Sequence, residues 1–397
     1  MISSIERFLN VSRKRSSNPE IHESEKNLKL FEQFSMGLFN TEIVEIYSSN
    51  VFPETIKYKN GDKFLLWDSA FWNIFNNIIA MYFMAIDAED ENLCKWIKQR
   101  LEAEIYYFMA LKTWDEIELS IEFARSYREL LHNEIQFQIT IEQLEVYNKH
   151  INEVTFIAKV FCLFHELNHM DNLESSAEFS SKRDAIVELF EITDKLLKED
   201  SDFLSQVRQH FSEENIYNAL LQIKEHKNLE LEIELTCDLA ALNDTVDFFE
   251  KVWTDFTKED IVSRVNEVVI VFNSVSFALT QTYRYWHYNY QYFLKHISLE
   301  KYYEKSEHAN QEAVLRYVLS DVAKSIQIYS LYGEKIDKIL NTDYYGIRFQ
   351  AENAFIEEVA YIINSREHFG KMCININNYE NVTEEKLESL RKILLNW

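Results

Sequence analysis

The sequence predicts a mainly α-helical fold. Apolar residues recur three and four positions apart over long stretches of the chain, which is the period of an amphipathic helix. The 397 residues include only 5 glycines and 2 prolines, which leaves little material for the many tight turns of an all-β or doubly wound fold. One stretch near the N-terminus has a β-strand pattern. We therefore expect a multi-helix domain with a small β-hairpin or sheet near its N-terminus.

The first part of the chain is expected to be a flexible lead-in followed by this hairpin. Residues 1–29 are assigned to the lead-in, because from Val11 onward they are polar, locally basic and without periodicity. The hairpin is predicted at about 54–67, where Asn60-Gly61 supplies the two residues with positive φ that a type I′ turn needs. Residues 43–47 have the composition of a third strand.

From Asp68 onward the pattern is helical. Asp68 or Ser69 is the predicted cap of a first helix with a wide apolar stripe, and Asn228 is the predicted cap of a later one. No internal repeat or linker rich in Pro, Gly or Ser interrupts the series, so residues 30–397 are predicted to form a single domain. Further helices are expected at about 92–111, 114–133, 140–170, 228–252, 260–295, 311–332 and 383–397, with two or three more within 182–224.

Composition excludes several classes of function. The formal net charge of -25 repels nucleic acid and anionic membranes, so neither is expected as a partner. The two most hydrophobic segments, 71–86 and 265–279, are interrupted by asparagine and glutamate, which favours buried helices over membrane spans. The 4 cysteines are far apart and no secretory segment opens the chain, which indicates a reducing, cytoplasmic setting.

The pentapeptide His165-Glu-Leu-Asn-His169 lies within the apolar helical run at 140–170. Residues four apart share one face of a helix, so both histidines can point at a single metal ion while Glu166 lies beside it. This is the signature of a zinc peptidase, with Zn²⁺ as the expected cofactor. A zinc ion held by two histidines also needs a third protein ligand and an open position for water.

The third ligand is predicted from the helix at 228–252. Glu234 and Asp238 lie one turn apart beside its buried stripe, so Glu234 can reach the metal while Asp238 accepts a hydrogen bond from a ligand histidine. An ordinary acidic helix edge is the alternative interpretation of this pair. Small residues on both helices would allow a close approach: Ala158, Cys162, Cys237 and Ala241.

A His-Glu-x-x-His helix followed by a helix with Glu-x-x-x-Asp resembles the gluzincin branch of zinc metallopeptidases, with Cys237 where that family often has alanine. The metzincin pattern fits poorly, because Asn172 and Ser175 stand where glycine and the third ligand should be. Phage-exclusion peptidases of the Lit type are similar in being cytoplasmic and compact, with such a helix in mid-chain. That resemblance implies a zincin-like domain and a role in defence by cleaving a host protein.

The predicted mechanism is hydrolysis of a protein or peptide substrate. Zinc would polarise the scissile carbonyl, and Glu166 would act as the general base on the bound water. Peptidases of this kind also use a donor for the tetrahedral oxyanion. The residues considered for that role or for substrate binding are His287, His308 and Arg316, although ordinary helix positions explain all three more simply.

Two other interpretations remain open. Glu166-x-x-His169 and Glu129-x-x-His132 together suggest a di-iron carboxylate oxidoreductase, with Glu104 and Glu234 as further ligands, but this leaves His165 without a role. Otherwise His132 is a surface or satisfied histidine. The third interpretation is a non-enzymatic helical interaction protein. The oligomeric state is not indicated by the sequence.

Overall fold

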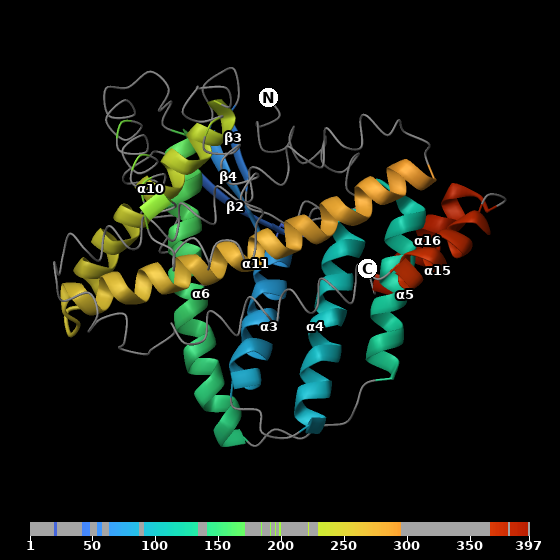
Figure 1. Cartoon of the computed structure of the whole chain (residues 1–397), viewed down its shortest axis with the longest axis horizontal. Helices are drawn as coiled ribbons and strands as arrows, with labels where there is room; N and C mark the ends of the chain where they lie inside the picture. The colour runs from blue at the N-terminus through green and yellow to red at the C-terminus, as the bar shows by residue number, and fades with distance from the viewer. Residues whose placement is uncertain are drawn as a thin grey trace. The chain divides into compact units, whose positions relative to one another are not determined.

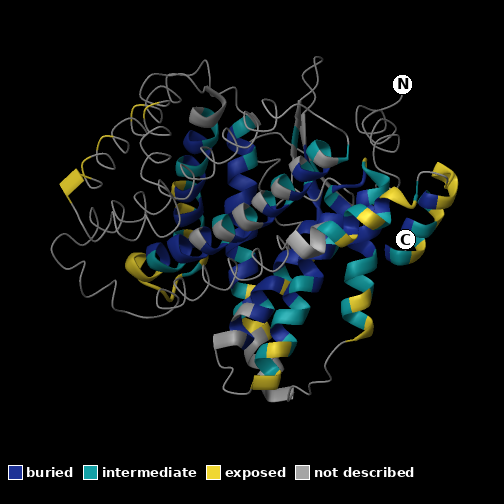
Figure 2. Cartoon of the chain, turned by 45° about the vertical axis from the view of Figure 1, so that its right-hand side comes forward, coloured by how far each residue is buried: buried dark blue, intermediate teal, exposed yellow. Residues whose placement is uncertain are grey.

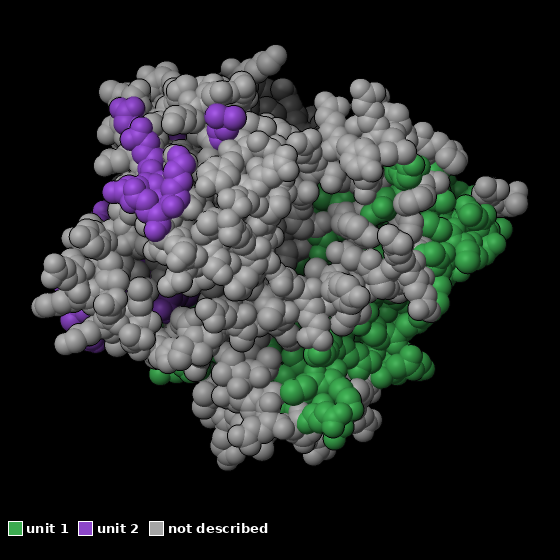
Figure 3. Space-filling view, in the orientation of Figure 1, with its two compact units in different colours: residues 1–155, 278–299, 352–397 green, residues 156–277, 300–351 purple. Residues whose placement is uncertain are grey.

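The computed structural model confirms the mainly α-helical fold (Figure 1). Contacts divide the chain into two compact units, coloured separately in Figure 3. Unit 1 comprises 1–155, 278–299 and 352–397, and unit 2 comprises 156–277 and 300–351. The structure describes residues 20–21, 42–47, 54–57, 63–86, 91–133, 141–170, 229–294, 366–379 and 382–395, with a few isolated helical positions between 184 and 221.

Unit 1 contains a four-stranded sheet in the order β1-β2-β4-β3. Its strands are β1 (Glu20–Ile21), β2 (Glu42–Tyr47), β3 (Glu54–Lys57) and β4 (Lys63–Asp68). Strands β3 and β4 form the predicted antiparallel hairpin, and β2, the predicted third strand, pairs parallel with β4. The pairing of β1 with β2 differs from the flexible lead-in expected for 1–29.

The hairpin register bears on the predicted turn. Lys57 pairs with Lys63, which leaves five residues between them. The Asn60-Gly61 turn predicted for this connection lies among those five residues. The turn residues themselves lie outside the described part of the chain.

Strand β4 leads directly into α3 (Ser69–Ile86). The side chain of Asp68 caps this helix, because its Oδ1 accepts a hydrogen bond from the backbone N–H of Ala70 at 3.0 Å. Trp67 stacks on Trp72 with ring centroids 5.1 Å apart, which fixes the strand against the first turn of the helix. The predicted cap is thereby confirmed, and burial of the described stripe residues confirms the apolar stripe.

The helices α3, α4 (Glu91–Lys112) and α5 (Ile117–His132) pack in series in unit 1. The tight connection between α4 and α5 is held by Ser120, whose hydroxyl donates to the carbonyl of Ala110 at 2.6 Å. The terminal helices α15 (Arg366–Asn377) and α16 (Glu384–Leu395) pack on α5. Buried positions line the inward faces of the unit 1 helices in Figure 2.

Unit 2 contains the part of the fold that carries the predicted metal ligands. Its described helices are the C-terminal half of α6 (Ile141–Met170), α10 (Leu229–Val252) and the N-terminal part of α11 (Lys258–Phe293). Aromatic pairs join them: Phe156 meets Phe249 and Phe164 meets Phe248 between α6 and α10, and Phe161 meets Phe272 between α6 and α11.

Helix α11 begins at Lys258, two residues before the predicted start at 260. Thr257 and Asp260 explain this position, because the Thr257 hydroxyl accepts the backbone N–H of Asp260 at 3.1 Å. In return, the Asp260 carboxylate accepts from the backbone N–H of Thr257 at 3.3 Å, which completes a reciprocal capping box.

Two of the unit boundaries fall inside α6 and α11 and the other two lie outside the described residues, so a single domain over 30–397 stays a prediction. The helices expected within 182–224 and at 311–332, and the cap at Asn228, lie outside the described residues. None of the described helices combines the length and the apolar character needed to cross a membrane.

Candidate metal centre

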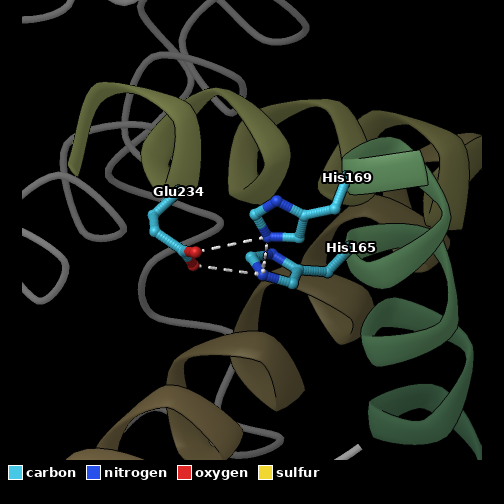
Figure 4. A group of neighbouring side chains, drawn as sticks. All are labelled: His165, His169 and Glu234. Atoms are coloured by element: carbon cyan, nitrogen blue, oxygen red, sulfur yellow. Dashed lines mark hydrogen bonds and ion pairs between the residues drawn. The ribbon is translucent and has the colours of Figure 1, made fainter. Parts of the chain in front are cut away.

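Helix α6 presents His165 and His169 one turn apart, and α10 presents Glu234 towards them (Figure 4). The histidines are side by side because the intervening sequence is helical without interruption. Within the described part of the chain, these three side chains are the one group of three whose potential ligand atoms lie close enough to share an ion. The structure thus brings together the three metal ligands that the sequence predicted.

The distances among the donor atoms are short. Nε2 of His165 lies 3.0 Å from Nε2 of His169. The carboxylate of Glu234 places Oε2 at 3.4 Å from Nε2 of His165 and Oε1 at 3.4 Å from Nε2 of His169. The dashed lines in Figure 4 mark these three contacts, which form a small triangle.

This triangle has the dimensions of a metal site. Two donors that are each about 2.0–2.2 Å from a tetrahedral zinc ion are about 3.3–3.6 Å apart. The two carboxylate contacts match this spacing, and the contact between the ring nitrogens is slightly shorter. Two imidazoles and one carboxylate leave a fourth position for water or substrate, so the donor set fits a catalytic zinc site.

Asp238 lies on the other side of His165. Its Oδ1 is 2.8 Å from Nδ1 of His165, although the two groups are not aligned as a linear hydrogen bond. With Nδ1 facing this carboxylate, Nε2 is the nitrogen turned towards Glu234 and His169. A carboxylate behind a ligand histidine fixes its tautomer and ring orientation, which is the role that the sequence assigned to Asp238.

The electrostatic environment of His165 favours a positive charge. Burial of the ring opposes its protonation, but the carboxylates of Asp238 and Glu234 outweigh burial and raise the pKa of His165 to about 10. The same carboxylates would stabilise a divalent cation in place of the proton.

The small residues predicted between the helices are buried. Ala158 and Cys162 on α6 are exposed by 0% and 5%, and Cys237 and Ala241 on α10 are both exposed by 0%. Small buried side chains leave room for backbones to approach, which is what a site shared by two helices needs. Neither cysteine forms a disulfide.

Glu166, the predicted general base, follows His165 on α6 and is half-buried. It belongs to the same turn as His165, so helix geometry keeps it beside the metal ligands. Its catalytic role stays a prediction.

Of the three residues considered for oxyanion or substrate binding, only His287 is described. It lies on α11 in unit 1, with Nδ1 at 3.1 Å from Oε2 of Glu116 and its ring stacked on Tyr283. The metal ligands belong to unit 2. His308 and Arg316 lie outside the described residues.

The residues invoked for a di-iron centre are placed differently. Glu129 and His132 are exposed near the end of α5, and Glu104 is buried with Arg100 at 3.9 Å. In the described ranges, none of these three residues joins a group with ligand spacing.

The sequence did not single out Asn168, which is 4% exposed and lies between the ligand histidines. Its Nδ2 donates to the carbonyl of Phe164 at 2.8 Å and to Oδ2 of Asp244 on α10 at 3.2 Å. The one signal in the sequence was a polar amide on a helix that is otherwise largely apolar at this point.

Comparisons of the chain with protein-family models, with curated proteins and with solved structures each gave no match. The function is therefore inferred from the chemistry of this centre.

Proposed function

We propose that the protein is a zinc-dependent endopeptidase whose centre is formed by His165, His169 and Glu234. The observation that carries this proposal is the triangle of donor atoms, with Nε2 of His165 at 3.0 Å from Nε2 of His169 and both within 3.4 Å of the Glu234 carboxylate. Two histidines and a carboxylate are a common ligand set of catalytic zinc. When bound there, zinc would polarise a carbonyl and lower the pKa of a water towards about 7.

The protein's own groups would carry the remaining steps. Glu166 would accept the proton of the attacking water and deliver it to the leaving amine, because it is a carboxylate on the same turn as His165. Asp238 would hold the imidazole of His165 with Nε2 directed at the centre. The defence role implied by the Lit-type resemblance stays a prediction.

The first test is metal content. Protein that is purified without added metal and then incubated with divalent metal ions should contain one bound zinc ion per chain. One iron per chain would point to an oxygenase, since iron enzymes use a similar ligand set of two histidines and one carboxylate. Two irons would instead support the di-iron oxidoreductase, and no bound metal would support a helical interaction protein.

The second test is cleavage. Cells that express the wild type should contain new protein termini that are absent from cells expressing Glu166→Gln, while both proteins bind zinc. Glu153→Gln, the same chemical change on the same helix, is the matched control and should retain cleavage. Full activity of Glu166→Gln would overturn the assignment of the general base.

A further inference from the structure

Helices α6 and α10 are in contact along two adjacent stripes of α6. On one stripe, His165 and His169 meet Glu234 and Asp238. On the next stripe, Phe164 packs on Phe248 with ring centroids 6.3 Å apart, and Asn168 donates to Asp244 at 3.2 Å. Phe164 and Asn168 each precede a ligand histidine by one residue, which is about 100° around the helix.

The two stripes are engaged by separate parts of α10. Asp244 follows Glu234 by ten residues, which is about 15 Å along a helix. The aromatic contacts of α6 with Phe249 and Phe272 also restrain the helix, but contact at one of these two places alone would restrain its roll beside Glu234 less than contact at both. Contact at both places opposes that roll. The direction of the two imidazoles towards Glu234 therefore depends on both stripes.

Asn168 is the polar member of the second stripe, and its side chain is buried and bonded to the helix backbone. It is 4% exposed, and its amide also donates to the Phe164 carbonyl one turn earlier at 2.8 Å. The second bond fixes the rotamer of the amide, so the bond to Asp244 transmits a restraint to the α6 backbone. Asp244 is half-buried on α10, where a charge-assisted hydrogen bond is stronger than one at an open surface.

We propose that Asn168 and Asp244 are positioning residues that fix the roll of α6, so that His165 and His169 point at the carboxylate of Glu234. Metal sites require their ligands to lie within about 0.5 Å and 10–20° of the productive geometry. A hydrogen bond beside the ligands meets that requirement. This inference rests on the proposed metal site, and it adds two residues that do not themselves coordinate the ion.

The test measures cobalt(II) binding to metal-free protein by its visible absorption, which reports both affinity and coordination geometry. Asn168→Asp places two carboxylates together, and the repulsion between these neighbours should lower the cobalt affinity by about tenfold. The added negative charge alone would favour a cation, so a loss reports displaced ligands. The double change Asn168→Asp with Asp244→Asn has the wild-type charge and reverses the hydrogen bond between the two positions, but it loses the bond to the Phe164 carbonyl, so affinity and spectrum should recover in part.

Position 244 gives a second comparison that adds no charge. Asp244→Asn keeps an acceptor for the Asn168 amide and should bind cobalt to within about threefold of the wild type. Asp244→Ala removes the acceptor and should weaken binding by about tenfold with an altered spectrum. If Asn168→Asp alone does not fold, this pair of variants tests whether the contact between Asn168 and Asp244 positions the ligands.

The outcomes separate this inference from the proposed function. If the wild type binds no divalent metal, both are overturned. If the wild type binds cobalt and the folded variants bind it with the same affinity and spectrum, only the role of Asn168 and Asp244 is overturned. Equal weakening by Asp244→Asn and Asp244→Ala would also overturn that role, because it would trace the effect to charge.

Discussion

Nδ1 of His165 lies 2.8 Å from Oδ1 of Asp238, while Nε2 of the same ring faces Glu234. Asp238→Ala should therefore weaken zinc binding by about 10–100-fold, because loss of a carboxylate behind a ligand histidine leaves the ring less well oriented and less basic. The affinity would be measured by competition with a chromophoric chelator. Asp247→Ala, an exposed change on the same helix with the same loss of charge, should bind zinc like the wild type. Unchanged affinity in Asp238→Ala would contradict the assigned role.

The long helices were predictable because apolar residues recur three and four positions apart along the whole of each one. Helices α6 and α10 begin and end within one residue of the limits expected from the pattern. The two-residue strand β1 was not predictable, since a segment of that length has no period and depends on its pairing with β2. The hairpin was predicted correctly from the alternating pattern, whereas its register could not be predicted, because register depends on the pairing of both strands.

Features of the site that depend on one helix were also predictable, whereas features that depend on the packing of two helices were not predictable from helix periodicity. The spacing of His165 and His169 is a property of one helix, so the sequence contained it. The placement of Glu234 beside them required a second helix, and it was predicted only because a recognisable pattern lay there. The contact between Asn168 and Asp244 depends on how α6 crosses α10, and the period of neither helix contains that information.

Removal of a metal ligand should lower metal content. His165→Ala and Glu234→Ala each delete one of the three proposed donors, so each should bind zinc far below one equivalent after dialysis against a weak chelator. Elemental analysis would measure this. His132→Ala is the control, since His132 is exposed on α5 and lies outside the cluster. A matching loss of metal in His132→Ala would instead support the di-iron interpretation.

The aromatic contacts between α6 and α10 should be important for the stability of unit 2. Phe249 is 0% exposed, and its ring lies 5.5 Å from Phe156 and 4.2 Å from Trp253. Phe249→Ala should lower the free energy of unfolding by about 3–5 kcal/mol, measured by urea denaturation without metal. Phe256→Ala is the control, because that ring is 39% exposed and should cost about 1 kcal/mol or less. Equal losses would contradict this account of the core.

The buried carboxyl of Glu104 should make unit 1 less stable as pH rises. Desolvation by burial is the largest influence on this group and raises its pKa, despite a hydrogen bond with Asn77 and the charge of Arg100. The folded state therefore retains the proton at pH values where the unfolded state has released it, and stability falls across that window. Glu104→Gln should remove this fall. In urea denaturation, its gain over the wild type should be larger at about pH 8 than at about pH 4, where both side chains are neutral. A gain independent of pH would rule out this origin.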